Sequence, residues 1–112
     1  MKKIEITFKG KTENYAYENN LDYEKAVKFC EKNGGTLPTH KFLWEEDKAQ
    51  NKYRWELLYE QLKEDEELPW AWTSEEYDFC RVWSVYLATG DAATLERSGA
   101  NSDDYALFLL ND

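Results

Sequence analysis

Two adjacent glycines followed closely by a proline constrain this chain more than any other feature of its sequence. Gly34 can adopt the left-handed conformation that closes a helix, and Gly35 allows a second turn without a side-chain clash. Pro38 fixes its own φ angle and favours an extended Leu37, which predicts that Leu37 enters a core. Thr39 is then placed as the N-cap of a new helix. These residues therefore predict a helix, a tight turn and a second helix.

The first of these helices is predicted to begin after Asp22, a residue type favoured at N-caps. Apolar groups follow at the spacing of one helical face, at Tyr23, Ala26, Val27 and Cys30. The helix should end at the glycine pair.

The second helix is less regular. Residues 40–49 are expected to begin it, and an apolar stripe continues through residues 52–63. The stripe consists of Trp55, Leu58, Tyr59 and Leu62. One long helix and two helices broken near residues 50–51 both fit this pattern.

Alternation of apolar and polar residues predicts the strands. Ile4, Ile6 and Phe8 alternate with polar residues, and residues 14–18 are the expected partner in a hairpin. A central strand is predicted at residues 81–87. Further strands are expected at residues 70–74, 91–97 and 105–110, with an acidic turn at residues 75–78.

Several of these motifs resemble those of a known group. A helix with Ala26 and Cys30, followed by the glycine pair and Leu-Pro-Thr, is similar to bacterial C-type-lectin-like domains of the collagen-like adhesin and formylglycine-generating-enzyme types. The segments Trp72-Thr73-Ser74-Glu75 and Trp83-Ser84-Val85, closed by Gly90, are similar to the adhesin type. The resemblance implies an α+β fold, with two helices packed on a small twisted antiparallel sheet and the first and last strands paired.

Composition indicates one domain spanning residues 1–112. Of the 112 residues, 42% are hydrophobic and 16% aromatic, which is ample for a core. The 23 acidic and 14 basic residues give a formal charge of -9, which disfavours direct binding to nucleic acid or to anionic membranes. The acidity either serves solubility alone or attracts a basic partner.

Targeting and redox features are sparse. The sequence lacks the apolar run of a signal peptide or of a membrane span, so a cytoplasmic location is expected. Cys30 and Cys80 are far apart, and free structural thiols in a reducing compartment are the preferred interpretation.

The sequence gives little basis for catalysis or for a cofactor. His40 is the single histidine and has no serine or cysteine close in sequence, so a nucleophilic triad is not expected. One histidine and two distant cysteines do not provide a zinc site. The calcium motifs of the resembled family and its closely spaced cysteine pair are missing. We therefore expect a non-enzymatic protein without metal or cofactor.

Binding of another molecule is the remaining class of function. The resemblance implies an irregular loop region at about residues 64–81, where aromatic residues alternate with carboxylates and suit a basic surface with apolar pockets. The predicted partner-binding residues are Glu64, Asp65, Glu66, Glu67, Trp70, Glu75, Glu76, Tyr77 and Asp78. Trp72 and Phe79 lie in the same region, and for them a place in the core is an equal alternative. Solvation of the loop is the competing explanation for the acids.

The leading hypothesis is a cytoplasmic binding protein whose acidic, aromatic face docks on a basic protein, such as a nucleic-acid-binding nuclease. A small acidic chain of this kind resembles phage and mobile-element inhibitors of the anti-CRISPR and anti-restriction types, and this step is analogy. The alternative is a calcium-independent lectin-like ligand-binding or adhesin module. An enzyme of the formylglycine-generating type ranks last.

Overall fold

Two three-stranded antiparallel sheets frame the domain in the computed structural model, which describes residues 2–64, 70–97 and 106–110. The first sheet has the order β1 (Lys2–Phe8), β2 (Lys11–Glu18) and β8 (Ala106–Leu109). The second has the order β5 (Trp70–Glu76), β6 (Arg81–Tyr86) and β7 (Ala92–Glu96). The helices are α1 (Tyr23–Lys32), α2 (His40–Leu43) and α3 (Arg54–Leu62), and a short hairpin consists of β3 (Glu46–Asp47) and β4 (Lys52–Tyr53). The α+β class expected from the sequence is confirmed.

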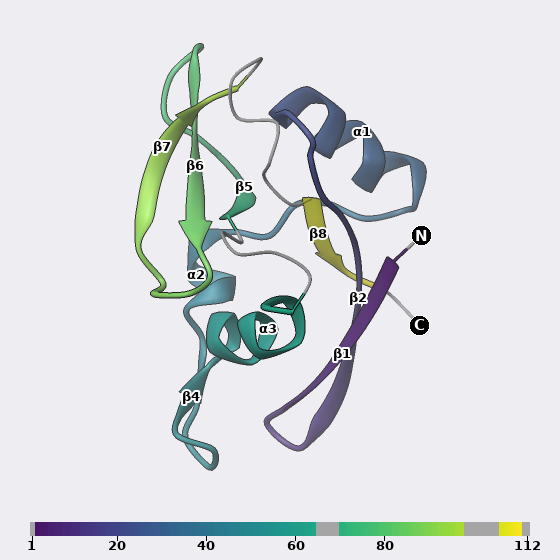
Figure 1. Ribbon diagram of the computed structural model, residues 1–112, viewed down its shortest axis with the longest axis vertical. Coiled ribbons are helices and arrows are strands. Elements are labelled where there is room, and N and C mark those ends of the chain that lie inside the picture. Colours follow the sequence, from purple (N-terminus) through teal and green to yellow (C-terminus); the bar gives the residue numbers. More distant parts are fainter. Residues whose placement is uncertain (1, 65–69, 98–105, 111–112) are drawn as a thin grey trace.

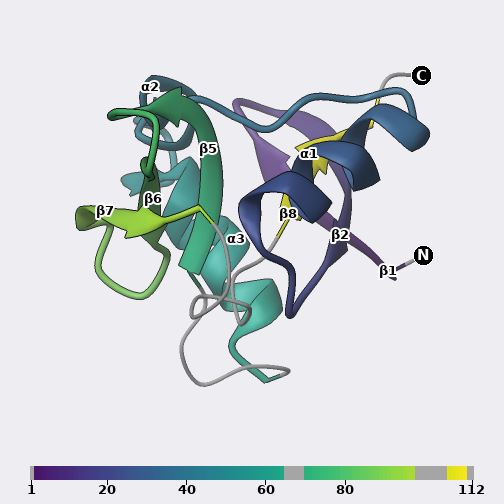
Figure 2. The same cartoon turned by 90° about the horizontal axis from the view of Figure 1, so that it is seen from above.

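Helices α1 and α3 lie between the two sheets, whereas α2 lies against the second sheet (Figure 1, Figure 2). In Figure 1, α3 lies between the lower parts of the sheets and α1 lies beside β8 in the upper part. Figure 2 shows the second sheet on one side of the molecule and the first sheet on the other. Two apolar clusters follow from this arrangement. One gathers around α3 and includes Phe8, Tyr15 and Leu58, and the other lies beneath α1 and includes Trp72 and Phe108.

The glycine turn after α1 has the predicted geometry. The N-cap carboxylate of Asp22 accepts a hydrogen bond from the Lys25 N–H at 2.9 Å. Gly34 has a φ of 78°, and the Gly35 N–H donates to the carbonyl of Cys30 at 2.8 Å, which is a Schellman closure. A Cβ atom on Gly35 would lie 2.1 Å from the Phe108 ring, so this glycine allows β8 to pack directly on the turn.

The segment after the turn also agrees with the sequence. Leu37 is buried in the cluster beneath α1. The Thr39 hydroxyl accepts a hydrogen bond from the Phe42 N–H at 3.1 Å and caps α2.

The region predicted as the second helix contains two helices, α2 and α3. The prediction of a helix over residues 40–49 is wrong beyond Leu43. The β3–β4 hairpin separates α2 from α3. Asp47 is buried, and its carboxylate accepts from the N–H groups of Lys9 and Ala49 and from the Gln50 side chain, at 2.8, 3.1 and 2.7 Å. Such side-chain hydrogen bonds to backbone compete with a helix and favour a turn.

The order of the first sheet differs from the expectation. β8 pairs with β2, so the predicted pairing of the first and last strands is wrong. The physical reason is the burial of β2 on both faces, which suits a central strand. Ala16 enters the cluster beneath α1, whereas Tyr15 and Tyr17 enter the cluster around α3. The β1–β2 hairpin itself is confirmed.

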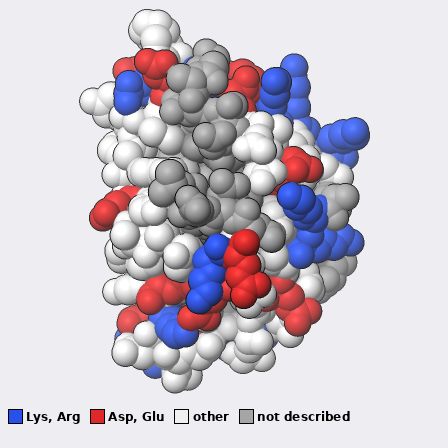
Figure 3. Space-filling model, viewed as in Figure 1, with Lys and Arg blue, Asp and Glu red and all other residues white. Residues whose placement is uncertain are grey.

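The surface carries charges of both signs. In the view of Figure 3, acidic and basic side chains are interspersed over the described part of the surface. None of the helices among the described residues has the length and the apolar character needed to cross a membrane.

Candidate functional site

The turn between β5 and β6 presents two aromatic side chains to solvent. Tyr77 is 60% exposed and Phe79 is 86% exposed, and they are the exposed large hydrophobic side chains among the described residues. We call this pair the aromatic tip. Phe79 buries little of its ring within this domain, so the tip is a candidate surface for contact with another molecule.

Local hydrogen bonds hold the turn in one shape. Asp78 Oδ1 accepts from the N–H groups of Cys80 and Arg81 at 2.8 and 2.9 Å. The Tyr77 N–H donates to the Arg81 carbonyl at 3.0 Å. Aspartate commonly fixes turns in this way. The conformation that leaves Phe79 in solvent is therefore fixed by its neighbours.

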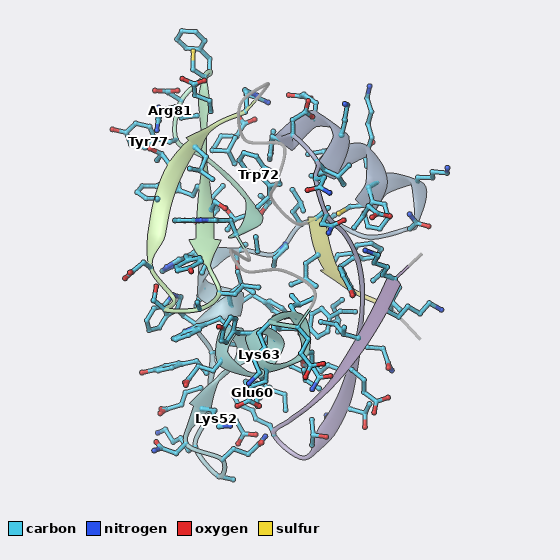
Figure 4. The ribbon with its side chains drawn as sticks, in the orientation of Figure 1. Lys52, Glu60, Lys63, Trp72, Tyr77 and Arg81 are labelled. Atoms are coloured by element: carbon cyan, nitrogen blue, oxygen red, sulfur yellow. The ribbon has the colours of Figure 1, made fainter. Side chains whose placement is uncertain are left out.

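The Tyr77 side chain packs on Trp83 of β6. Its ring meets the Trp83 ring edge to face, with the centroids 5.7 Å apart and the planes at 90°. Arg81 lies on the same face of β6, two residues before Trp83, and donates to the Thr94 hydroxyl and carbonyl at 3.0 and 2.6 Å. Figure 4 shows Tyr77 and Arg81 at the upper end of the second sheet, and Trp72 between the sheets.

Arg97 ties the turn to α1. Its guanidinium group binds the carboxylates of Glu24 and Glu76 at 2.8 and 3.1 Å and lies 5.0 Å from the centroid of the Tyr23 ring. It also donates to the Phe79 carbonyl at 3.3 Å. The hydrogen bond with Glu24 raises the pKa of Arg97 further, so this group stays charged.

The acidic turn predicted at residues 75–78 begins two residues later, because Glu75 and Glu76 are the last residues of β5. These two residues and Asp78 lie together at this end of the second sheet, and each has an internal partner. Glu75 accepts a hydrogen bond from the His40 N–H, Glu76 binds Arg97, and Asp78 closes the turn. All three are exposed. Sequence patterns did not reveal these structural roles, because two of the three partners are far away in the chain.

A pocket of about 250 Å³ opens beside the tip. It is lined by His40, Glu75, Trp83 and Ala92. These residues come from the start of α2 and from all three strands of the second sheet. Ala92 lies opposite Val85, and Thr94 lies opposite Trp83.

Other predicted site residues lie elsewhere. Trp70 is at the opposite end of β5 from Glu76, about 20 Å along a strand that rises roughly 3.3 Å per residue. It stacks on Tyr86 with the ring centroids 5.0 Å apart. Glu64 is exposed in the turn after α3. Asp65, Glu66 and Glu67 lie outside the described residues.

For Trp72 and Phe79, the sequence left a place in the core or at the surface as alternatives. The structure places one in the core and the other at the surface. Trp72 is fully buried, and its indole N–H donates to the Leu21 carbonyl at 2.9 Å. Phe79 is the most exposed of the large apolar residues among the part of the chain that is described. Its position at a hairpin turn was the available signal, because a turn has no neighbouring strand to cover its side chains.

The metal-ligating and nucleophilic side chains can also be placed. Within residues 2–64, 70–97 and 106–110, no group of three or more His, Cys, Asp or Glu side chains could hold a metal ion. Burial raises the pKa of the Cys30 thiol to about 12, which makes it a poor nucleophile. The His40 ring lies against Trp44, with the centroids 6.0 Å apart.

Models of protein families, curated proteins and solved structures gave no match to this chain.

Proposed function

We propose that this chain is a non-enzymatic protein-binding domain that docks through the aromatic tip onto a basic partner. The observation that carries the proposal is the 86% exposure of Phe79 on a turn that its own hydrogen bonds hold in place. Burial of a phenylalanine side chain at an interface contributes about 1.5–3 kcal/mol. Because the turn is already ordered, little conformational entropy opposes this gain.

Charge around the tip favours a basic partner. The carboxylates of this end of the molecule outnumber its cationic residues, which are Arg81, Arg97 and, next to Glu24 in α1, Lys25. The carboxylates belong to Glu24, Glu75, Glu76, Asp78 and Glu96. The whole chain has a formal charge of -9. Such an excess speeds the approach of a positively charged surface, and the aromatic pair then supplies short-range affinity.

Nucleic-acid-binding proteins form the partner class that this chemistry fits best. Their binding grooves combine basic residues with apolar and aromatic surfaces. In its narrower form the proposal is that the chain blocks such a groove on a nuclease, as inhibitors of the anti-CRISPR and anti-restriction types do. The narrower form rests on acidity and analogy.

Affinity capture from the cytosol of the native host, followed by mass spectrometry, tests the broader proposal. The wild type is compared with the double variant Tyr77→Ser and Phe79→Ser, and Trp70→Ser at the other end of β5 is the matched control. Proteins that bind the wild type and the control but not the double variant are the expected result. Equal retention of the captured proteins by the wild type, the double variant and the control would show that the tip is not the docking site.

Calorimetric titration of the captured protein, with and without DNA, tests the narrower form. DNA should lower the apparent affinity of the chain for its partner if both occupy one groove. An unchanged affinity at saturating DNA would exclude a nucleic-acid-site inhibitor while leaving the tip as the docking surface.

A second candidate function is calcium-independent binding of a ligand such as a carbohydrate. The observation in its favour is a groove of about 410 Å³ along residues 34–39, which Phe42 and Leu109 also line. Hydroxyl groups of Thr36 and Thr39 beside the Phe42 ring suit a molecule with both polar and apolar faces. Binding to a glycan array, abolished by Phe42→Ala and retained in the tip variant, would favour this function over the first.

We also propose that the fold is C-type-lectin-like. Support comes from the N-terminal hairpin and from the second sheet, which carries Trp72 and Trp83 on adjacent strands. The last strand returns to this hairpin but pairs with β2, whereas the resemblance implies pairing with the first strand. An experimental structure whose superposition on such domains failed beyond single elements would exclude this relationship.

A further inference from the structure

We infer that the pocket beside the aromatic tip binds a lysine or arginine side chain of the partner. This inference rests on the proposed function, because it names what a basic partner inserts next to Tyr77 and Phe79. Its basis is the geometry of the pocket formed by His40, Glu75, Trp83 and Ala92.

Aromatic rings form one corner of this pocket. Trp83 lines it, and the Tyr77 ring stands at 90° to the indole with the centroids 5.7 Å apart. A tryptophan face is the strongest of the aromatic sites for a cation. Tyr77, at 60% exposure, leaves the corner accessible from solvent.

A carboxylate adds a negatively charged hydrogen-bond acceptor to this pocket. Glu75 lines the same pocket and accepts one hydrogen bond, from the His40 N–H. A carboxylate has room for about four such bonds, so Glu75 retains acceptor capacity. A guanidinium or ammonium group in the pocket can therefore contact the ring and the carboxylate together.

The chain uses this combination elsewhere to hold its own cations. Arg54 lies 3.9 Å from the centroids of both Phe8 and Phe42 and binds Glu13. Arg97 lies over the Tyr23 ring and binds two carboxylates. In both cases a guanidinium group is held by a ring and by carboxylate oxygens.

The Trp83 pocket likewise combines a ring with a carboxylate, that of Glu75. Among the described residues, no Lys or Arg side chain lies over the Trp83 ring. Arg81, on the same face of β6, is held by two hydrogen bonds to Thr94. The volume of about 250 Å³ accommodates one long side chain. In this inference the partner supplies the guanidinium or ammonium group.

An NMR titration of the full chain tests this inference without knowledge of the partner. The probes are the N-acetyl N-methylamides of arginine, lysine and norleucine, the last being the neutral control. The indole N–H signals of Trp83 and Trp70 are followed in the same spectrum, so that Trp70 reports any non-specific effect. The variant Trp83→Phe assigns the Trp83 signal.

The two basic probes should shift the Trp83 signal at millimolar concentration, and norleucine should shift it several-fold less. Glu75→Gln keeps an oxygen for the His40 N–H and removes the charge, so it should weaken arginine binding about threefold to tenfold. Equal shifts with norleucine, equal shifts at Trp70, or no response to arginine would each overturn the inference.

Phe79→Ser separates this inference from the proposed function. The variant should leave the arginine response of Trp83 unchanged while it abolishes capture of the partner. Loss of capture in Phe79→Ser, together with no arginine response in the wild type, would refute binding of a basic side chain in the pocket. The aromatic tip would remain the docking surface. An arginine response in the wild type, with capture unaffected by Phe79→Ser, would refute docking through the aromatic tip and support binding of a basic side chain in the pocket.

Discussion

Arg54 donates hydrogen bonds from Nε and Nη2 to the two carboxylate oxygens of Glu13, over 2.9 and 2.8 Å. The Arg54 side chain is 5% exposed and is enclosed by the rings of Phe8 and Phe42. It also donates to the Phe42 carbonyl at 2.8 Å. This pair joins the start of α3 to β2, and it fixes the helix against the first sheet.

Arg54→Met should lower the free energy of unfolding by about 3–5 kcal/mol, because it leaves the Glu13 carboxylate without its partner in a largely buried place. Urea denaturation measures this change. Lys52→Met is the control, since it breaks the surface ion pair with Glu60 and should have little effect. Similar losses in both variants would mean that burial of the Arg54 pair carries no special stabilisation.

Stability should fall in acid because of Glu13. Burial disfavours its charge, but hydrogen bonds from Arg54 and Tyr15 outweigh burial and hold the pKa of Glu13 below its ordinary value of 4.5. The folded pKa is thus lower than the unfolded one. The charged carboxylate therefore stabilises the fold fully above the unfolded pKa, and this contribution disappears as the pH falls through the folded pKa.

Thermal unfolding between about pH 6 and pH 2 checks this. Glu13→Gln should lower the melting temperature at the upper end of this range and reduce its decrease toward the lower end. Glu5→Gln, which removes an exposed carboxylate away from Arg54, is the control. Parallel pH profiles for the wild type and Glu13→Gln would contradict the assignment.

Gly35→Ala should destabilise the protein by about 1–3 kcal/mol, because the new methyl group overlaps the Phe108 ring. Phe108→Leu in the same chain should make the substitution less costly. Gly34→Ala should cost about 1–2 kcal/mol through its left-handed backbone, and Phe108→Leu should not relieve it. Denaturation of the single and double variants gives both coupling energies. Additive effects for Gly35 and Phe108 would show that the turn moves away from β8.

The two thiols should react at very different rates. Cys80 is exposed in the β5–β6 turn, whereas Cys30 is buried and its pKa is raised to about 12. A thiol reagent such as dithionitrobenzoate should label one cysteine quickly in the native protein and the second only on unfolding. Cys80→Ser should abolish the fast phase. A fast phase that persists in this variant would show that α1 opens readily.

Local signals in the sequence predicted local structure well. Asp22, Gly34 and Thr39 act on backbone groups within five residues of their own positions, so their roles can be inferred without knowledge of the fold. The burial of Leu37 was predicted from the extended conformation that Pro38 favours for it. The structure around the glycine pair was therefore predictable in detail.

Long-range relationships were not predictable in the same way. Glu13 and Arg54 are 41 positions apart, and nothing in either sequence neighbourhood indicates that they pair. The β3–β4 hairpin depends on the contact of Asp47 with the backbone of Lys9, which is also distant in the chain. Competition from such contacts overrides the helical pattern of residues 44–49.

The candidate site was predicted in part for the same reason. Glu75, Glu76, Tyr77 and Asp78 lie together because they are consecutive. Trp70 is separated from them because β5 is extended, so nearness in sequence does not mean nearness in space. The exposure of Phe79 depends on the absence of a covering strand at the turn, which only the pairing of β5 with β6 reveals.

The position of β8 sets the order in which this molecule can be completed on the ribosome. Phe108 closes over Gly35, and Leu107 and Leu109 pair with Tyr17 and Tyr15, yet these residues are synthesised after all the other described strands and helices. Until residue 109 has emerged from the exit tunnel, the nascent polypeptide has an open edge on β2 and an uncovered glycine turn. Productive folding should therefore follow the emergence of this segment from the exit tunnel rather than its synthesis.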